Sequence, residues 1–194
     1  MNLIERAKNI LTTPKTEWLV IATETTPMMT LLVNYVLPLT IIYSLGSFLT
    51  GMFWSSLFGG FQYAIISAIV TILSAIVTFF IASYAVDMLA PSFGSEKNLD
   101  RSAQLVAYSN TAVWVAGLLS FIPLLGLLIT IAGAVYTIYL MYLGIGPLKK
   151  TPEDKKVIYM IIVFVIMLIV GGIISYILRM IFFRAMGYGI GGWY

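Results

Sequence analysis

Apolar residues fill five long stretches of the chain, and polar residues gather in the connections between them. The stretches cover, to within a few residues, Met28–Thr50, Tyr63–Leu89, Ala103–Phe121, Leu124–Ile145 and Val157–Met180. A helix rises about 1.5 Å per residue and a bilayer's hydrocarbon core is about 30 Å thick, so a span needs about 20 residues. Each stretch is near or above that length. The pattern therefore predicts five transmembrane helices.

The composition excludes the other fold classes. The chain is 60% hydrophobic and only 10% charged, whereas soluble domains are about 25% charged. Membrane β-barrel strands alternate in character over about ten residues, and these stretches are longer and apolar throughout. We predict an all-α polytopic membrane protein in which residues 1–194 form a single membrane domain.

The basic residues predict the orientation of the chain in the membrane. With the N-terminus in the cytosol, nine of the eleven basic residues lie on the cytosolic side, as the positive-inside rule expects. Only Arg179 and Arg184 then lie outside. We predict a cytosolic N-terminus, an external C-terminal tail over 184–194, and a location in a prokaryotic plasma membrane. The nine inside residues are Arg6, Lys8, Lys15, Lys97, Arg101, Lys149, Lys150, Lys155 and Lys156.

The segment before the first span, residues 1–26, has the pattern of short surface helices. Asn2 and Glu5 have the spacing of a helix-capping pair. Such a helix can lie in the membrane interface or pack on the cytosolic end of the bundle, and the sequence favours neither. Apolar positions recur at helical spacing, at Leu3, Ile4, Ala7, Ile10 and Leu11.

Prolines mark several boundaries along the chain. Pro14 and Pro27 predict helix starts, and Thr151-Pro152-Glu153-Asp154 predicts the start of the fifth span, with Thr151 as its cap. Pro123 predicts a tight turn, so that the third and fourth spans form an antiparallel hairpin. Pro38 interrupts the first span and predicts a kink there.

Small and hydroxyl residues repeat at helical spacing in three spans. This pattern is typical of close helix packing in lipid, which we favour here, and the alternative is a hydroxyl-lined path for a small solute. The repeats are Ser67, Thr71, Ser74 and Thr78 in the second span, Thr130, Gly133, Thr137, Met141 and Gly144 in the fourth, and Gly171 and Ser175 in the fifth.

Two asparagines lie at matching depth in the first and third spans. Asn34 and Asn110 are each seven residues, about 10 Å, from the predicted cytosolic face. We hypothesise a polar pocket open to the cytosol and ringed by five residues. Ordinary hydrogen bonding between helices, with solvated acids in the loops, is the alternative interpretation. The five residues are Glu24, Asn34, Asp87, Gln104 and Asn110.

No sequence motif indicates catalysis. The chain has no His and no Cys, so the usual soft or imidazole metal sites and the common nucleophile–base pairs are missing. The glycine-rich run Gly187–Gly192 is too loosely spaced for a phosphate loop. We predict no enzyme activity, no cofactor, no metal site and no nucleic-acid partner.

The order of several short motifs resembles the Yip family of integral membrane proteins, in its small prokaryotic form. The motifs are Pro14 with Trp18, Ala107-Tyr108-Ser109, Pro123 with Gly126, Tyr139–Gly144, and the linker Lys150–Lys155. The chain departs from the family pattern at Thr111, where relatives often carry proline. The resemblance implies a five-span bundle. Eukaryotic relatives are associated with GTPase binding through a longer N-terminal region, and we do not carry that role over.

These patterns together predict a non-enzymatic protein that organises membrane or binds a partner protein. The expected partners are the lipid bilayer and either a second copy of the chain or another membrane protein. The alternative is a channel or transporter for a small solute or cation that uses the predicted pocket as its cytosolic vestibule.

Overall fold

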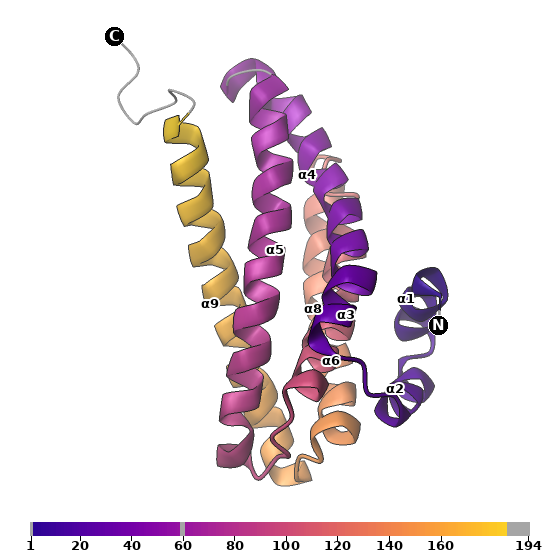
Figure 1. The fold of residues 1–194 in the computed structure, drawn as a ribbon. Coiled ribbons are helices and arrows are strands. Elements are labelled where there is room, and N and C mark those ends of the chain that lie inside the picture. The colour runs from indigo at the N-terminus through magenta and orange to yellow at the C-terminus, as the bar shows by residue number, and fades with distance from the viewer. Residues whose placement is uncertain (1, 59–60, 186–194) are drawn as a thin grey trace.

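The computed structural model describes residues 2–58 and 61–185, and this part of the chain is helical with no strand (Figure 1). The predicted all-α class is confirmed. The predicted tail, including Gly187–Gly192, lies almost entirely outside the described residues. In chain order the elements are α1 (Leu3–Thr12), α2 (Pro14–Thr23), α3 (Met28–Leu31), the π-helical turn η1 (Leu32–Val36), α4 (Leu37–Phe58), α5 (Phe61–Leu89), the 3₁₀ turn η2 (Ala90–Phe93), α6 (Leu99–Ser109), α7 (Thr111–Gly117), α8 (Leu125–Lys149) and α9 (Glu153–Ala185).

Four segments of the described chain are long and apolar enough to cross a membrane as continuous helices: Met28–Phe53, Phe61–Phe93, Leu125–Lys149 and Glu153–Phe182. The third predicted span differs, because it is divided into α6 and α7 at Asn110. The Asn110 carboxamide donates to the Val106 carbonyl of its own helix at 2.8 Å. Such side-chain bonds compete with the helical backbone ladder and disturb it locally.

α5 and α6 form the centre of the bundle. α5 packs against α4, α6 and α9, while α6 also packs against α3 and α8. Every residue of α6 from Ser102 to Ser109 is buried. A helix that is buried on all sides belongs to the core rather than to the lipid-facing surface.

The two ends of the bundle differ in charge. One end holds the α5–α6 and α8–α9 connections, and we call it the basic end because Lys97, Lys149, Lys150, Lys155 and Lys156 lie there. The opposite, far end holds the end of α4, the start of α5 and the end of α9 (Figure 1).

The predicted α7–α8 hairpin is present, but its turn is broader than expected and lies short of the far end. The turn covers residues 118–124, with Leu124 at a φ of 61°. The Ser120 hydroxyl lies 3.3 Å from that of Thr50, and α4 continues for another eight residues, about 12 Å. Beyond the turn, α4, α5 and α9 continue (Figure 1).

The predicted helix starts are largely present. The Asn2 side chain caps α1 by accepting from the Ile4 amide at 3.1 Å, and α2 begins at Pro14. α9 begins at Glu153, and the Thr151 hydroxyl does not cap it. That hydroxyl instead accepts from Ser95 at 2.9 Å and donates to the Ile145 carbonyl at 3.3 Å, which ties the two connections together.

A kink was predicted at Pro38, and the helix is irregular in the turn just before this residue, where η1 is π-helical. A proline ring clashes with the carbonyl four residues earlier and has no N–H to donate. A π-helical turn over Leu32–Val36 widens the helix at that place.

α1 and α2 form a hairpin against the side of α8 (Figure 1). The Tyr136 hydroxyl donates to the Leu11 carbonyl at 2.8 Å. A Cβ at Gly144 would lie 2.7 Å from the Trp18 ring, so glycine permits this close approach. The inner face of the N-terminal segment therefore packs on the side of the bundle, and not on its cytosolic end as one of the two alternatives expected. Its outer face exposes 73% of Ile4 and 62% of Leu19, which is compatible with a position in the membrane interface.

Candidate functional site: a polar cleft over α5 and two paired charge clusters

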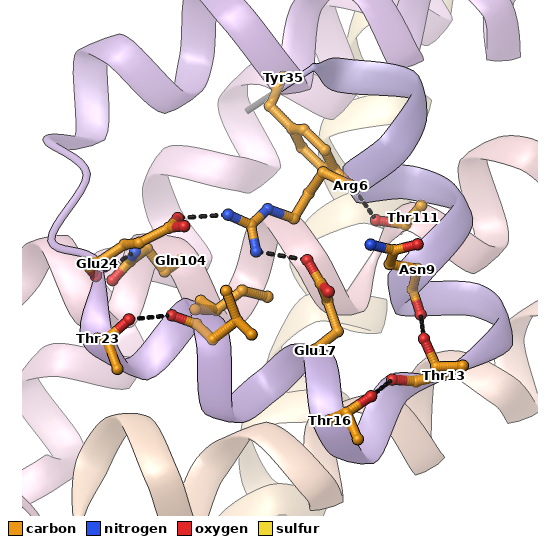
Figure 2. Close-up of polar contacts among 12 residues, drawn as sticks. Arg6, Asn9, Thr13, Thr16, Glu17, Thr23, Glu24, Tyr35, Gln104 and Thr111 are labelled. Carbon is orange, nitrogen blue, oxygen red and sulfur yellow. Dashed lines mark hydrogen bonds and ion pairs between the residues drawn. The ribbon is translucent and has the colours of Figure 1, made fainter.

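A buried arginine joins the N-terminal hairpin to the bundle. Arg6 on α1 is only 3% exposed. Its guanidinium contacts the Glu17 carboxylate at 2.5 Å and also the Glu24 carboxylate (Figure 2). The guanidinium lies 5.5 Å from the centre of the Tyr108 ring. Burial acts to lower the pKa of Arg6, but the hydrogen bond with Glu24 and the nearby acidic groups outweigh it, and the pKa is raised. Arg6 therefore remains a cation that is paired with two carboxylates. We call Arg6, Glu17 and Glu24 the arginine cluster.

Two residues of α6 hold the end of α2 beside this cluster. Gln104 donates to the Glu24 carbonyl at 2.9 Å. Arg101 donates to the same carbonyl at 2.8 Å and to that of Ile21 at 3.2 Å. Carbonyl groups at the end of a helix need such partners, so these contacts fix the hairpin in place.

A second cluster lies where α5, α6 and α8 meet at the basic end. Lys149 is fully buried, and its ammonium donates to the Ser102 hydroxyl at 2.7 Å and to the Asn98 carbonyl at 3.2 Å. The Asp87 carboxylate lies 3.5 Å from the ammonium and accepts from Ser102 at 3.3 Å. We call these residues the lysine cluster. A serine beside a lysine forms the nucleophile–base pair of some hydrolases, but Ser102 and Lys149 are both 0% exposed and are engaged in structural bonds.

The predicted ring of five polar residues does not form one pocket. Glu24 and Asn34 line a common cavity of about 190 Å³, which Gln104 adjoins through its bond to Glu24. Asp87 belongs to the lysine cluster, and Asn110 lines a different cavity. The depth argument fails because equal depth does not place two side chains on the same side of a helix, where each residue turns by about 100°.

The cavity that contains Asn110 is a cleft of about 330 Å³ over α5. Its walls come from α4, α5, α6, α7 and α9, and it reaches the bundle surface, because it is also lined by Leu168, which is 58% exposed. The predicted small-residue face of α9 opens it: a Cβ at Gly171 would meet only Thr78 within 4 Å, and one at Gly172 would meet nothing. Its polar lining includes Tyr43, Ser47, Thr71, Ser74, Thr78, Asn110, Ser175 and Arg179.

The hydroxyl groups in this cleft are only partly paired. Thr71 donates to Ser47 at 2.8 Å. The hydroxyls of Ser74 and Thr78 are buried and have no hydrogen-bond partner among the described residues. The face predicted from Ser67, Thr71, Ser74 and Thr78 is therefore a cavity wall as well as a packing surface. By contrast, the predicted face of α8 is a packing surface, where Gly133 meets Ala116.

A smaller cavity of about 210 Å³, the outer lobe, lies toward the far end and shares Ser47 and Arg179 with the cleft. Thr50, Ser67 and Ser120 add hydroxyl groups to it. Arg179 follows Gly171 and Ser175 at intervals of four residues, which places all three on one face of α9. That spacing is the sequence signal that would have linked Arg179 to the cleft.

The described residues contain no group of three or more His, Cys, Asp or Glu side chains arranged to hold a metal ion. The chemistry that the cleft offers is hydrogen bonding, one positive charge and apolar contact.

Comparison with known proteins identifies the family but adds no detailed template. No curated protein and no solved structure showed significant similarity to the chain. The family model described as the Yip1 domain matches residues 8–191. The match covers the N-terminal hairpin from Lys8 onward, every long helix, and both charge clusters except for Arg6. The chain therefore belongs to the Yip1 family, as its motifs predicted.

Proposed function

We propose that this protein is a non-enzymatic integral membrane protein that works by binding a partner molecule within the bilayer. The observation that carries the proposal is the cleft over α5, which combines unpaired hydroxyl groups with a route to the bundle surface. Pockets that bind small molecules are concave, largely apolar and supplied with a few polar groups. The cleft meets each of these conditions.

The region between the cleft and the basic end supports binding over conduction. α6 is buried throughout Ser102–Ser109, and the arginine and lysine clusters lie around it. Their charged groups are occupied by one another. Carriers driven by ions usually place ionisable residues in a pathway through the membrane, whereas here the buried charges lie in packed contacts.

The alternative of a channel or transporter draws its support from the row of hydroxyls on α5. Ser67 lines the outer lobe, and Thr71, Ser74 and Thr78 line the cleft. A conformational change that opened the basic end would turn this row into a path. We regard it as the second candidate.

Flux measurements in liposomes separate the two functions. The chain has no cysteine, so the Ser74→Cys variant carries a single thiol that a bulky reagent can modify in the cleft. We expect potassium, chloride and glycerol to cross at the rate of protein-free liposomes, before and after modification. Saturable flux of any of them that modification of this thiol blocks would replace the binding proposal with transport.

The predicted orientation and assembly remain part of the proposal. We place the basic end in the cytosol of a prokaryotic cell and the far end outside, on the charge distribution. A second copy or another membrane protein would meet α9, whose Gly172 is uncovered. Labelling of Lys97→Cys and Arg184→Cys with an impermeant thiol reagent in intact cells tests the orientation, and we expect only the second to react.

A further inference from the structure

We propose that the cleft and the outer lobe together hold one anionic amphiphile of the bilayer, with its acidic headgroup at Arg179 and a chain along α5. This inference rests on the proposed binding function and names the class of ligand. The juxtaposition that carries it is an uncompensated arginine at the mouth of a cleft that has unpaired hydroxyls at depth and apolar walls.

Among the residues that the structure describes, Arg179 has no acidic neighbour in either cavity. None of the described residues that line the cleft or the outer lobe is acidic, and Arg179 makes no ion pair or hydrogen bond with any other described residue. Arg6 and Lys149, by contrast, each have a carboxylate partner. Arg179 therefore offers its charge to a ligand, and that ligand must be anionic.

The position of Arg179 matches the headgroup level of a bilayer. It lies 22 residues beyond Val157, the first residue of the apolar part of α9, or about 33 Å along the helix. That distance is close to the thickness of the hydrocarbon core. A basic residue at this level attracts acidic lipid headgroups by its charge, and the hydroxyls of Thr50 and Ser120 in the outer lobe can add hydrogen bonds to headgroup oxygens.

The unpaired hydroxyls point to polar atoms deeper in the same ligand. Ser74 is 7% exposed, and its hydroxyl lines the cleft without a partner among the described residues. It lies seven residues, about 10 Å, further along α5 than Ser67 of the outer lobe. A buried polar group without a hydrogen-bond partner is energetically unfavourable, so a ligand that supplies the partner is favoured there. Ester or hydroxyl groups at the junction of headgroup and chain can satisfy Ser74 and Thr78.

The walls of the cleft favour an amphiphile over a free anion. Val70, Phe79, Val106 and Met167 supply buried apolar surface, which a small hydrated anion cannot use. Leu168 and Gly172 lie at the opening on α9 and are exposed, so a lipid can enter sideways from the bilayer. The cleft and the outer lobe have room for the junction between headgroup and acyl chain and for part of one acyl chain. The rest of the lipid remains in the bilayer.

Native mass spectrometry of the full chain in mild detergent tests the inference. The probes are phosphatidylglycerol, phosphatidylcholine and inorganic phosphate, added separately. We expect retention of one phosphatidylglycerol with at least a tenfold preference over phosphatidylcholine. The Arg179→Gln variant should lose that preference, Arg179→Lys should keep most of it, and Arg184→Gln, which changes the next arginine of α9, should leave it unchanged.

Two further measurements distinguish a lipid headgroup from free phosphate as the bound anion and show whether each variant is folded. Gly171→Leu fills the cleft without altering the charge and should reduce binding of both lipids, while thermal unfolding confirms that each variant is folded. Equal binding of phosphatidylglycerol by the wild type and folded Arg179→Gln would overturn the proposal, as would Arg179-dependent binding of phosphate with no lipid preference. If the protein shows no preference for phosphatidylglycerol and the liposome assay shows no flux, the anionic amphiphile is rejected as the ligand. The proposed binding function is then not contradicted.

Discussion

The polar residues of the arginine and lysine clusters and those in the cleft over α5 are of similar kinds but have opposite surroundings. In the two clusters, Arg6 and Lys149 are buried against carboxylates, and Ser102 bonds to both Lys149 and Asp87. In the cleft, Ser74 and Thr78 have no partner among the described residues, and no acidic residue of the described chain pairs with Arg179. The difference shows how to separate polar groups that hold a membrane bundle together from groups that are available to a ligand.

Pairing decides the energetic role of each group. A buried charge with a partner is costly to disrupt, because removal of one member leaves the other uncompensated. A buried hydroxyl without a partner already carries its cost in the empty protein. Substitutions in the two regions should therefore change stability by different amounts, and the following predictions run from the largest effect to the smallest.

Removal of Lys149 should have the largest effect. Lys149→Met leaves Asp87 buried without its cation, which should destabilise the protein by about 3–5 kcal/mol. Denaturant unfolding in detergent measures the change. Lys150→Met is the matched control, since its side chain is 77% exposed, and it should cost less than about 1 kcal/mol. Equal losses in the two variants would contradict a structural role for the lysine cluster.

Removal of Arg6 should release the N-terminal hairpin. Arg6→Met leaves Glu17 buried and unpaired, at a cost of about 3 kcal/mol that falls mainly on the contacts of α1 and α2. Hydrogen exchange should rise over residues 3–23 and change little in α5. Lys8→Met, an exposed position on the same helix, should leave exchange unaltered. Faster exchange throughout the bundle would show that the arginine cluster supports more than the hairpin.

Two serine substitutions compare the regions directly. Ser102→Ala removes a partner of both Lys149 and Asp87 and should destabilise by about 1–3 kcal/mol. Ser74→Ala removes a hydroxyl that has no partner, so unfolding of the lipid-free protein should change by less than about 0.5 kcal/mol or shift toward greater stability. A large loss for Ser74→Ala without ligand would mean that this hydroxyl is structural.

The exposed pair of Glu96 and Lys150 should give the smallest effect. The hydrogen bond from Lys150 holds the pKa of Glu96 below its usual value of 4.5, and the charge of Lys150 adds to this. A lowered pKa means that the bridge is intact above the ordinary pKa and is lost as the pH falls through the lowered one. In Lys150→Met the pKa of Glu96 should rise toward 4.5, as a carbon NMR titration of the carboxyl group can measure. An unchanged pKa would show that the pair does not persist in solution.

The length of the apolar stretches was enough to predict the long helices, because lipid leaves the backbone few alternatives to a continuous helix. The stretches around α4, α5, α8 and α9 were long and apolar, and each forms a long helix. The third span was apolar too, but the break at Asn110 depends on one side chain that bonds to Val106. The length of an apolar stretch does not resolve such a local competition.

The site was harder to predict, because it depends on which side of each helix a residue occupies. Asn34 and Asn110 have the same depth but line different cavities. Lys149 looked like an ordinary cytosolic lysine, and its burial follows from the meeting of α5, α6 and α8, which no local pattern encodes. Arg179 was within reach of prediction through its spacing from Gly171 and Ser175.

Sided labelling of one introduced cysteine tests the contrast between the two regions most directly. Ser74→Cys lies in the cleft, and Ala107→Cys on α6 is a matched control, because Ala107 is 0% exposed. A small, membrane-impermeant thiol reagent is applied to sealed vesicles of each orientation. We predict that Ser74→Cys reacts only when the reagent is on the side of the far end, and that Ala107→Cys reacts in neither. Reaction of Ser74→Cys from the basic end would show a path across the bundle and would contradict closed packing around the arginine and lysine clusters.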